Sequence, residues 1–406
     1  MLSLYIHIPF CAQICKYCSF SVLENQSEDL IQSYLTRLHQ EIDHYGELFP
    51  GAEIKSLYFW GGTPNLIWAE QLIKLIDHCV QVFNCEHMAE LSFEFNPYPS
   101  DQILELVKTL NNTYQKRSRV RYSFWIQSFD NAVLSSVGRP CTFPGLVDFL
   151  RRLQPLKQEN NIFNFDFIAF GKFNQTKKWN LQLRTPSAID FFSDFTHSWF
   201  ADSFSLYTLE LSENQRRKKS DSPSLIQQGC FGSQDEIYEE FSYLKAILLD
   251  AGYSRYEISN FSLLSKSSIH NRVYWEMEEY LGLGLGASSF LHASSLQTHE
   301  VGPYGARFTN TPYLPKYLNG ETTNADTIER LQQSDFLIEK FFLGLRTDRG
   351  VQNTEEFLSI LIPEYQEKLW TYEQEGLIIK KGEGFVLSDR GMDCYNSIIT
   401  TLLKEI

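Results

Sequence analysis

Three cysteines near the start of the chain have the spacing of iron–sulfur ligands. Cys11, Cys15 and Cys18 are separated by three and two residues and follow a short apolar segment. Cubane clusters normally take four thiolates, and no fourth cysteine follows within a plausible loop. One iron of such a cluster would therefore stay open to another ligand. The alternatives are a zinc loop, which needs a fourth ligand nearby, or three buried cysteines.

Small and polar residues recur around the ends of later apolar segments. Two adjacent glycines permit close backbone approach and present amide and carbonyl groups to a ligand. A carboxylate on an otherwise apolar strand needs a partner, which a ribose hydroxyl would supply. Taken singly, each residue also fits a tight turn, a helix cap or a surface pair. The residues are Gly61, Gly62, Thr63, Glu94, Gln127, Arg139 and Asp166.

A third candidate site lies in the segment His270-Asn-Arg-Val-Tyr274-Trp275. Imidazole is an axial ligand of heme iron, and the rings of Tyr and Trp offer flat faces for stacking on a porphyrin. The same residues also fit a satisfied histidine beside a core tryptophan. Heme binding by His270, Tyr274 and Trp275 is therefore one of two open interpretations.

Alternating strand-like and helix-like segments position these residues. Strands are predicted at 2–8, 54–60, 91–96, 121–127, 165–170 and 203–211. Helices are predicted at 28–45, 68–83 and 188–198. A further helix is predicted to begin at residue 100, and helical segments after the fourth strand are predicted to end at residue 156. Six such repeats imply an α/β fold with a parallel sheet, helices outside and strands buried on both faces. Functional residues of such sheets gather at the carboxyl ends of the strands, where the cysteines fall.

Composition narrows the function classes. The chain has 406 residues, of which 43% are hydrophobic, and a net charge of −14. That length suits one large domain and a smaller one, and the negative charge argues against non-specific nucleic-acid binding. No apolar run is long enough to span a membrane, and no secretory signal is visible. We therefore expect a cytoplasmic protein without a transmembrane segment. The five other cysteines are scattered and suggest no disulfide framework.

Several motifs together resemble the heme chaperone HemW family of the radical S-adenosylmethionine (SAM) superfamily, a relative of oxygen-independent coproporphyrinogen III oxidase. They are Tyr5-Ile-His-Ile-Pro-Phe-Cys11, Gly61-Gly-Thr-Pro64, Ile126-Gln-Ser-Phe129, Tyr256-Glu-Ile-Ser-Asn-Phe261, Tyr280-Leu-Gly-Leu-Gly284 and Phe342-Leu-Gly-Leu-Arg346. The resemblance implies a radical-SAM partial (β/α)6 barrel over residues 1–215 and an extension carrying the His-Asn-x-x-Tyr-Trp motif over 216–324. It further implies a small α+β, winged-helix-like domain over 325–406.

The resemblance also implies roles for single residues. Cys11, Cys15 and Cys18 would hold a [4Fe-4S] cluster whose open iron is chelated by SAM. The positions that match SAM contacts of the wider family are Tyr5, Tyr17, Gly61, Gly62, Thr63, Glu94, Gln127, Arg139 and Asp166.

Two functions follow from the resemblance. In the first, the protein binds heme and passes it to an apo-hemoprotein, with an electron donor as a further partner and membrane contact made through the recipient. In the second, it is an oxidoreductase of porphyrin biosynthesis that oxidises coproporphyrinogen III through a 5′-deoxyadenosyl radical. Phe20 stands where the oxidase has an additional cysteine. This residue and the His270 motif favour the chaperone, while enzymatic turnover is left open.

Overall fold

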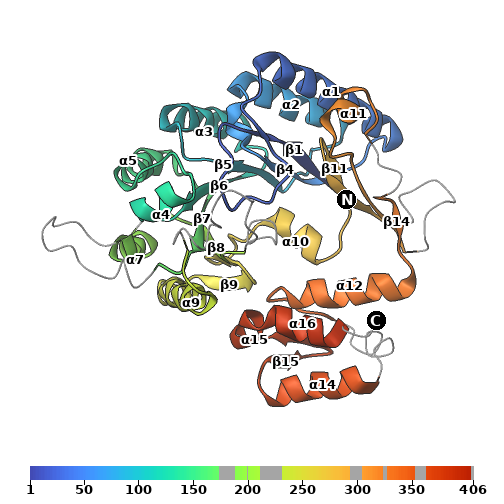
Figure 1. Ribbon diagram of the computed structural model, residues 1–406. Coiled ribbons are helices and arrows are strands. Elements are labelled where there is room, and N and C mark those ends of the chain that lie inside the picture. Colours follow the sequence, from blue (N-terminus) through green and yellow to red (C-terminus); the bar gives the residue numbers. More distant parts are fainter. Residues whose placement is uncertain are drawn as a thin grey trace, which may run out of the picture.

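A large twelve-stranded sheet forms the centre of the molecule, and a small α+β unit adjoins it (Figure 1). The structure is a computed structural model and describes residues 1–172, 188–198, 200–210, 231–292, 304–322, 327–352 and 363–403. Residue 211, the predicted end of the sixth strand, lies outside these ranges. Among the helices described, none has the length and apolar character needed to cross a bilayer.

Seven neighbouring strands of the sheet are parallel. In spatial order they are β11 (Tyr280–Leu283), β1 (Leu2–Ile8), β4 (Ile54–Gly61), β5 (Glu90–Phe95), β6 (Arg119–Gln127), β7 (Asn161–Ala169) and β8 (Ser203–Thr208). Antiparallel strands extend both edges: β10 (Asn260–Ser262) and β9 (Ser254–Glu257) beside β8, and β12 (Ser288–Leu291), β13 (Ala306–Thr309) and β14 (Glu329–Arg330) beside β11. The six predicted parallel strands are confirmed. β11 was missed because it returns to β1 from far along the chain.

Helices follow the strands and cover the outer face of the sheet, as Figure 1 shows. They are α1 (Glu28–Leu48), α2 (Ala69–Val82), α3 (Ser100–Tyr114), α4 (Asn131–Ser136), α5 (Phe143–Leu153), α7 (Ala188–Ser198) and α9 (Gln234–Asp250), with short 3-10 turns η1 (Pro64–Leu66) and η2 (Gln154–Leu156). Ser27 caps α1, because its hydroxyl accepts the Leu30 N–H at 3.3 Å. Such a cap typically stabilises a helix by about 1 kcal/mol.

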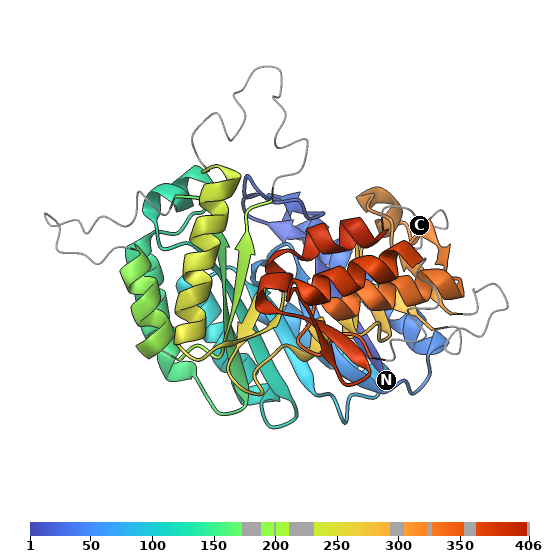
Figure 2. The same cartoon turned by 90° about the horizontal axis from the view of Figure 1, so that it is seen from below.

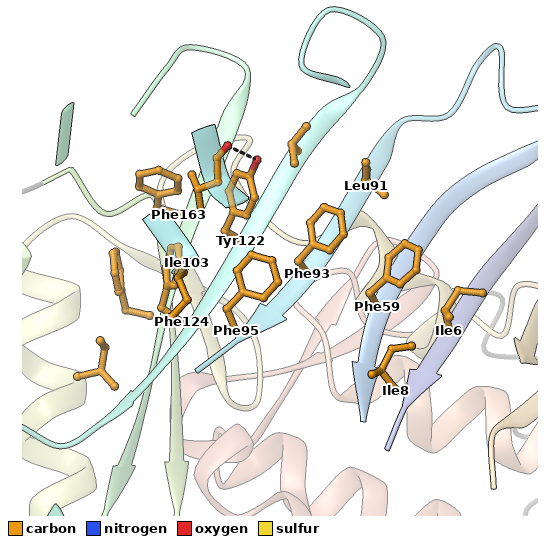
Figure 3. Packing of buried hydrophobic residues seen from close by; sticks show 14 of the residues in the cluster. Ile6, Ile8, Phe59, Leu91, Phe93, Phe95, Ile103, Tyr122, Phe124 and Phe163 are labelled. Atoms are coloured by element: carbon orange, nitrogen blue, oxygen red, sulfur yellow. Dashed lines mark hydrogen bonds between the residues drawn. The ribbon is translucent and has the colours of Figure 1, made fainter. Parts of the chain in front are cut away.

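Aromatic side chains fill the space between the sheet and its helices. The rings of Phe59 and Phe93 stack with centroids 5.3 Å apart, and Phe93 stacks on Tyr122 at 6.0 Å. Figure 3 shows these side chains projecting from neighbouring strands on the same side as Phe95 and Phe124. Burial of each such ring contributes about 1.5–3 kcal/mol. This apolar layer accounts for the predicted helix-covered face.

The opposite, inner face of the parallel strands is also buried, but it is polar. Because strand side chains alternate between faces, the residues between the aromatic ones point together into the interior. They are Ser56, Tyr58, Ser92, Glu94, Arg121, Ser123, Asn164, Asp166, Ser203 and Ser205. The prediction that the strands are buried on both faces is confirmed. The apolar residues of the strands belong to the outer face, and the polar residues belong to the inner one.

Later segments close the inner side and lead into the C-terminal unit. The helix α10 (Ile269–Trp275) contacts β4 and β5, and α11 (Leu314–Leu318) lies beside α1. The C-terminal unit comprises α12 (Gln333–Leu345), α14 (Pro363–Gln374), β15 (Ile378–Lys381), β16 (Gly384–Leu387), α15 (Asp389–Asp393) and α16 (Tyr395–Leu403). The unit therefore contains a two-stranded hairpin, in which β15 and β16 pair antiparallel. Strands from residues 254–309 join the main sheet, so the sheet continues past residue 215, and the three-part domain division stays a prediction.

Two basic side chains fasten the C-terminal unit to the main sheet. Lys245 of α9 lies 2.7 Å from Asp389 and 2.6 Å from Asp393. Arg255 of β9 lies 2.7 Å from Asp393, and its guanidinium is nearly buried. Figure 2 shows the C-terminal helices alongside the sheet rather than beyond its end. Paired, hydrogen-bonded charges of this kind are costly to break singly, so the unit is held in a defined position.

Candidate functional site

The cysteine loop lies at the carboxyl end of β1, between two short paired strands, β2 (Phe10–Cys11) and β3 (Leu23–Glu24). Its three thiols are partly exposed and form no disulfide. The Cys18 N–H donates to the Cys15 carbonyl oxygen at 2.9 Å, which folds this part of the loop into a turn. Among the described residues no three ligands are gathered as a closed metal site.

The protein environment keeps two of the thiols protonated and places a cation beside the third. Burial raises the pKa of Cys11 to about 11, and burial also raises the pKa of Cys18. A guanidinium nitrogen of Arg139 lies 3.8 Å from the Cys15 sulfur, and the Thr63 hydroxyl lies 3.5 Å from the Cys11 sulfur. Since thiolate is the metal-binding form, cluster assembly must release protons from this loop.

The Gly61-Gly62-Thr63 turn at the end of β4 packs against the segment that carries the cysteines. The Gly62 N–H donates to Ile8 O, and the Thr63 N–H donates to Phe10 O, both at 2.7 Å. A Cβ atom at Gly62 would lie 2.6 Å from Phe10 O, a separation that side chains do not tolerate. The glycine is thus required by close contact with the cysteine segment. The amides of Gly62 and Thr63 are thus bonded within the protein, and the contact of this turn with SAM stays a prediction.

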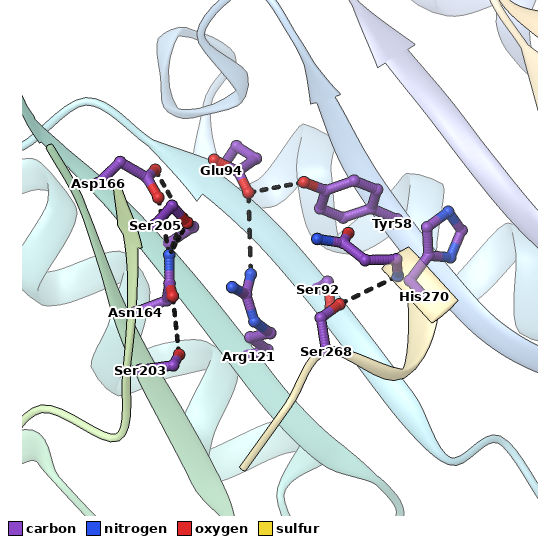
Figure 4. Close-up of polar contacts among 12 residues, drawn as sticks. Tyr58, Ser92, Glu94, Arg121, Asn164, Asp166, Ser203, Ser205, Ser268 and His270 are labelled. Atoms are coloured by element: carbon purple, nitrogen blue, oxygen red, sulfur yellow. Dashed lines mark hydrogen bonds and ion pairs between the residues drawn. The ribbon is translucent and has the colours of Figure 1, made fainter. Parts of the chain in front are cut away.

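Glu94 on the inner face of β5 is surrounded by donors from the protein itself. The Tyr58 hydroxyl donates to one carboxylate oxygen at 2.6 Å, the Trp125 indole N–H donates to the other, and Arg121 lies 3.8 Å away (Figure 4). Burial and the nearby Asp166 raise the pKa of Glu94 to about 8. The carboxylate therefore has partners already. A carboxylate accepts more than two hydrogen bonds, so a ribose hydroxyl remains compatible with this position.

Gln127 and Arg139 lie closer to the cysteine loop. Gln127 has a backbone φ of 67° where β6 bulges against β7, and its side-chain oxygen is buried without a hydrogen-bond partner among the described residues. Arg139 donates to Asn96 Oδ1 at 3.1 Å and to the Trp125 carbonyl. An unpaired buried carbonyl costs about 1–3 kcal/mol. This orphaned oxygen fits a site that receives a donor from a cofactor.

The remaining predicted contacts divide between the loop and the interior. Tyr17 is part of the cysteine loop, and its ring meets the edge of Phe170 at 6.0 Å. The Tyr5 hydroxyl lies 2.9 Å from His7 Nδ1 on the inner side of β1. Asp166 on β7 accepts hydrogen bonds from Ser123 and Asn164, both at 2.7 Å, and burial raises its pKa. All these positions lie towards the same end of the sheet or on its inner face, as parallel strands require.

Sequence reasoning missed most of the polar interior. The partners of Glu94 and Asp166 include Tyr58, Arg121, Ser123, Trp125 and Asn164. The available signal was the alternation of polar and apolar residues in β6, which reads Arg-Val-Arg-Tyr-Ser-Phe-Trp-Ile-Gln. This period of two separates the faces of a strand. It was overlooked because the strands were identified by apolar content alone.

The structure gives the three predicted heme residues partners within the protein. His270 has no exposed surface; its Nδ1 lies 2.8 Å from the Ser56 hydroxyl and its Nε2 lies 2.9 Å from the Tyr274 hydroxyl. The Arg346 guanidinium lies 4.5 Å over the Trp275 ring. Ligation of iron by His270 would require one of its two bonds to break. The heme role of these residues stays a prediction.

The start of α10 is held by a buried carboxylate. Glu90 accepts hydrogen bonds from the Ile269 and His270 N–H groups, each at 3.1 Å, and from the Ser268 hydroxyl at 3.2 Å. It also pairs with Arg119. Burial alone would raise the pKa of Glu90, but Arg119 and the other donors lower it to about 2. The His270 segment is therefore fixed to the amino end of β5.

Comparisons with known proteins show which families the chain is similar to. Residues 5–174 match the family described as the radical SAM superfamily. The chain is 27% identical over 411 residues to the heme chaperone HemW of Lactococcus lactis subsp. lactis (strain IL1403), covering 99% of this chain and 97% of that protein. It is 28% identical over 413 residues to the heme chaperone HemW of Bacillus subtilis (strain 168), covering 100% of both.

A solved structure shares the fold over the full length. The coproporphyrinogen III oxidase HemN from Escherichia coli, titled as a radical SAM enzyme, superposes with a TM-score of 0.73 at 18% identity. The match covers 100% of this chain and 90% of that one. It confirms the predicted α/β fold with a sheet rich in parallel strands.

Proposed function

Because the chain belongs to the radical SAM superfamily, we propose that it is a heme chaperone, which binds heme and delivers it to an apo-hemoprotein. Its full-length similarity to proteins named heme chaperone HemW carries the proposal. The similarity covers the cysteine loop, the polar interior and the C-terminal unit alike. The recipient hemoprotein, an electron donor and a cytoplasmic location are parts of the same proposal.

The family's cofactors, a [4Fe-4S] cluster and SAM, fit residues of this chain. Cys11, Cys15 and Cys18 would hold the cluster, and the Arg139 guanidinium beside Cys15 offsets negative charge on the thiolates. The buried, unpaired oxygen of Gln127 offers SAM an acceptor. When bound, the cluster supplies one-electron chemistry and an open iron.

Phe20 favours the chaperone over the oxidase. Its side chain is 51% exposed, and its ring meets Trp60 edge-on at 4.9 Å. Trp60 in turn contacts Tyr58 and Tyr5, so aromatic rings continue from the cysteine loop into the interior. Where the oxidase pattern has a further thiol, this chain therefore presents an apolar ring. Such a ring can stack on a flat macrocycle but cannot ligate iron or transfer an electron as a thiolate does.

One experiment with three arms tests the proposal. The protein is reconstituted anaerobically and titrated with heme, and the heme complex is then mixed with apomyoglobin as acceptor. Separately, the protein is incubated with coproporphyrinogen III, SAM and reductant. We expect saturable heme binding, transfer to apomyoglobin seen in the Soret band, and no oxidised porphyrin product. Failure to bind heme, or conversion of coproporphyrinogen III with consumption of SAM, would overturn the chaperone assignment.

A further inference from the structure

The polar interior of the sheet is closed at one end and adjoins the cysteine loop at the other. α10 covers the amino ends of β4 and β5, where it is anchored on Glu90. The carboxyl ends of the same strands lie beside the cysteine loop. In Figure 4, labelled side chains from β4 to β7 project from the same face of the sheet. The end of these strands that α10 does not cover is the cysteine-loop end, from which a ligand would approach.

Arg121 is a buried cation in this interior that lacks hydrogen bonds. Its side chain is 2% exposed, and among the described residues its guanidinium makes no hydrogen bond. The carboxylate of Glu94, at 3.8 Å, is its ion-pair contact. A guanidinium carries five N–H donors, and burying a charge without hydrogen-bonded partners is strongly unfavourable. The geometry thus leaves a planar set of donors unused inside the protein.

A neighbouring arginine shows how a purely structural guanidinium is treated in the same fold. Arg119, two residues earlier on β6, pairs with Glu90 and donates to the carbonyl oxygens of Ser265 and Ser267. Those partners hold the start of α10 in place. Arg121 is more deeply buried than Arg119, yet among the described residues it has no comparable set of hydrogen-bonded partners. This contrast singles out Arg121 as a candidate to bind a ligand.

The charges around Arg121 favour an anion. The ionisable groups that act on it or respond to it are Glu90, Glu94, Asp166, Tyr58, Tyr256 and His270. Glu90 is ionised but already paired with Arg119. Burial raises the pKa values of Glu94, Asp166 and both tyrosines and lowers that of His270, which favours the neutral form of each. Arg121 therefore lies among groups that are mostly favoured in their neutral forms, with the Glu94 carboxyl group at 3.8 Å as its ion-pair contact.

We propose that Arg121 binds a carboxylate of the ligand that enters the interior, and that this carboxylate is a propionate of the porphyrin. Guanidinium matches a carboxylate in a planar, two-bond arrangement. The aromatic rings of Phe20 and Trp60 lie at the entrance and suit the macrocycle. This assignment rests on the proposed heme binding and places the acid group on the polar inner face of the sheet.

The test compares heme with heme dimethyl ester, in which both propionates are uncharged. Each is titrated into reconstituted wild-type protein and into Arg121→Gln. A charge-assisted hydrogen bond contributes about 1.5–3 kcal/mol, which corresponds to roughly 10- to 100-fold in affinity. We expect the wild type to prefer heme over the diester by this factor, and Arg121→Gln to bind both with the affinity of the diester.

Two controls separate the outcomes. Arg121→Lys keeps the charge and should retain part of the preference. SAM also carries a carboxylate, so its effect on the EPR signal of the reduced cluster is measured in Arg121→Gln, where we expect no change. Loss of that effect with unaltered heme affinity would overturn the propionate assignment. If the wild type bound heme and the diester equally well, the propionate assignment would be overturned. If the wild type bound neither heme nor the diester, the proposed heme binding itself would be refuted.

Discussion

The cysteine loop and the His270 helix both offer candidate metal ligands, yet their surroundings are opposite. The three thiols are partly exposed on a loop, where the Thr63 hydroxyl lies beside the Cys11 sulfur and the Arg139 guanidinium lies beside the Cys15 sulfur. The imidazole of His270 is fully buried, and each ring nitrogen has a protein partner within 3 Å. The loop sulfurs are thus partly open to solvent, whereas ligation of a metal by His270 would require one of its hydrogen bonds to break.

The difference teaches that a residue type suited to a cofactor is weak evidence without its surroundings. Cysteine spacing constrains three sulfurs to one loop, so the sequence pattern itself carries geometry. The His-Asn-x-x-Tyr-Trp pattern fixes which side chains share a helix face but not what that face meets. Here His270 and Tyr274 face β4, while Trp275 lies under Arg346 of the C-terminal unit. The helix joins two parts of the fold.

The largest effect is expected at the loop. Cys15→Ala should abolish the cluster, because two thiolates cannot hold a cubane cluster in place. Anaerobic reconstitution of the wild type should give about four irons and four sulfides per chain, and the variant close to none. Cys85→Ala, which removes another partly exposed thiol, is the matched control and should keep the full iron content. A complete cluster spectrum in Cys15→Ala would contradict the ligand assignment.

His270→Ala should lower the free energy of unfolding by about 2–4 kcal/mol, because it leaves the Ser56 and Tyr274 hydroxyls unpaired and opens a cavity. Urea denaturation measures the change. The control is His44→Ala, which removes an exposed histidine on α1. If His270 were instead a free heme ligand, stability would be unchanged and the Soret band of the heme complex would shift. That result would erase the contrast between the two regions.

Sequence patterns predicted the parallel strands and their helices well because each is a local, periodic signal. Residues 2–8 and 188–198 were placed with the bounds that the structure has. The edge strands β9 to β14 were not predicted, since they are short and pair with segments distant in the chain. Hydrophobicity alone identifies a strand, but its neighbours in the sheet depend on long-range contacts.

The candidate site was predicted in part for the same reason. The cysteines, Gln127 and Arg139 fall together because parallel strands end at a common edge. What could not be predicted is how Glu94 is satisfied, since Tyr58 and Trp125 come from two other strands. Likewise the role of Gly62 follows from contact with Phe10, which no local pattern reveals. Which side chains meet across neighbouring strands depends on the tertiary structure and cannot be read from a local sequence pattern.

The smallest effect is a pH dependence of stability that sharpens the account of His270. Burial lowers its folded pKa from 6.5 to about 3, so below pH 6.5 the unfolded chain takes up a proton that the folded chain does not. The contribution of the neutral, buried His270 to the free energy of unfolding is therefore fully present above about pH 6.5. This contribution is lost as the pH falls towards 3, at about 1.4 kcal/mol per pH unit. Burial of His7, whose pKa falls to about 4, acts in the same direction, and the raised pKa of Glu94 opposes both.

Comparison with His270→Gln isolates the His270 contribution, because Gln can bond the same hydroxyls without titrating. Urea denaturation of both proteins is measured from pH 7.5 to 5. The free energy of unfolding of the wild type minus that of His270→Gln should decrease by this slope below pH 6.5. If the two free energies instead changed in parallel with pH, the imidazole would not be held neutral in the fold.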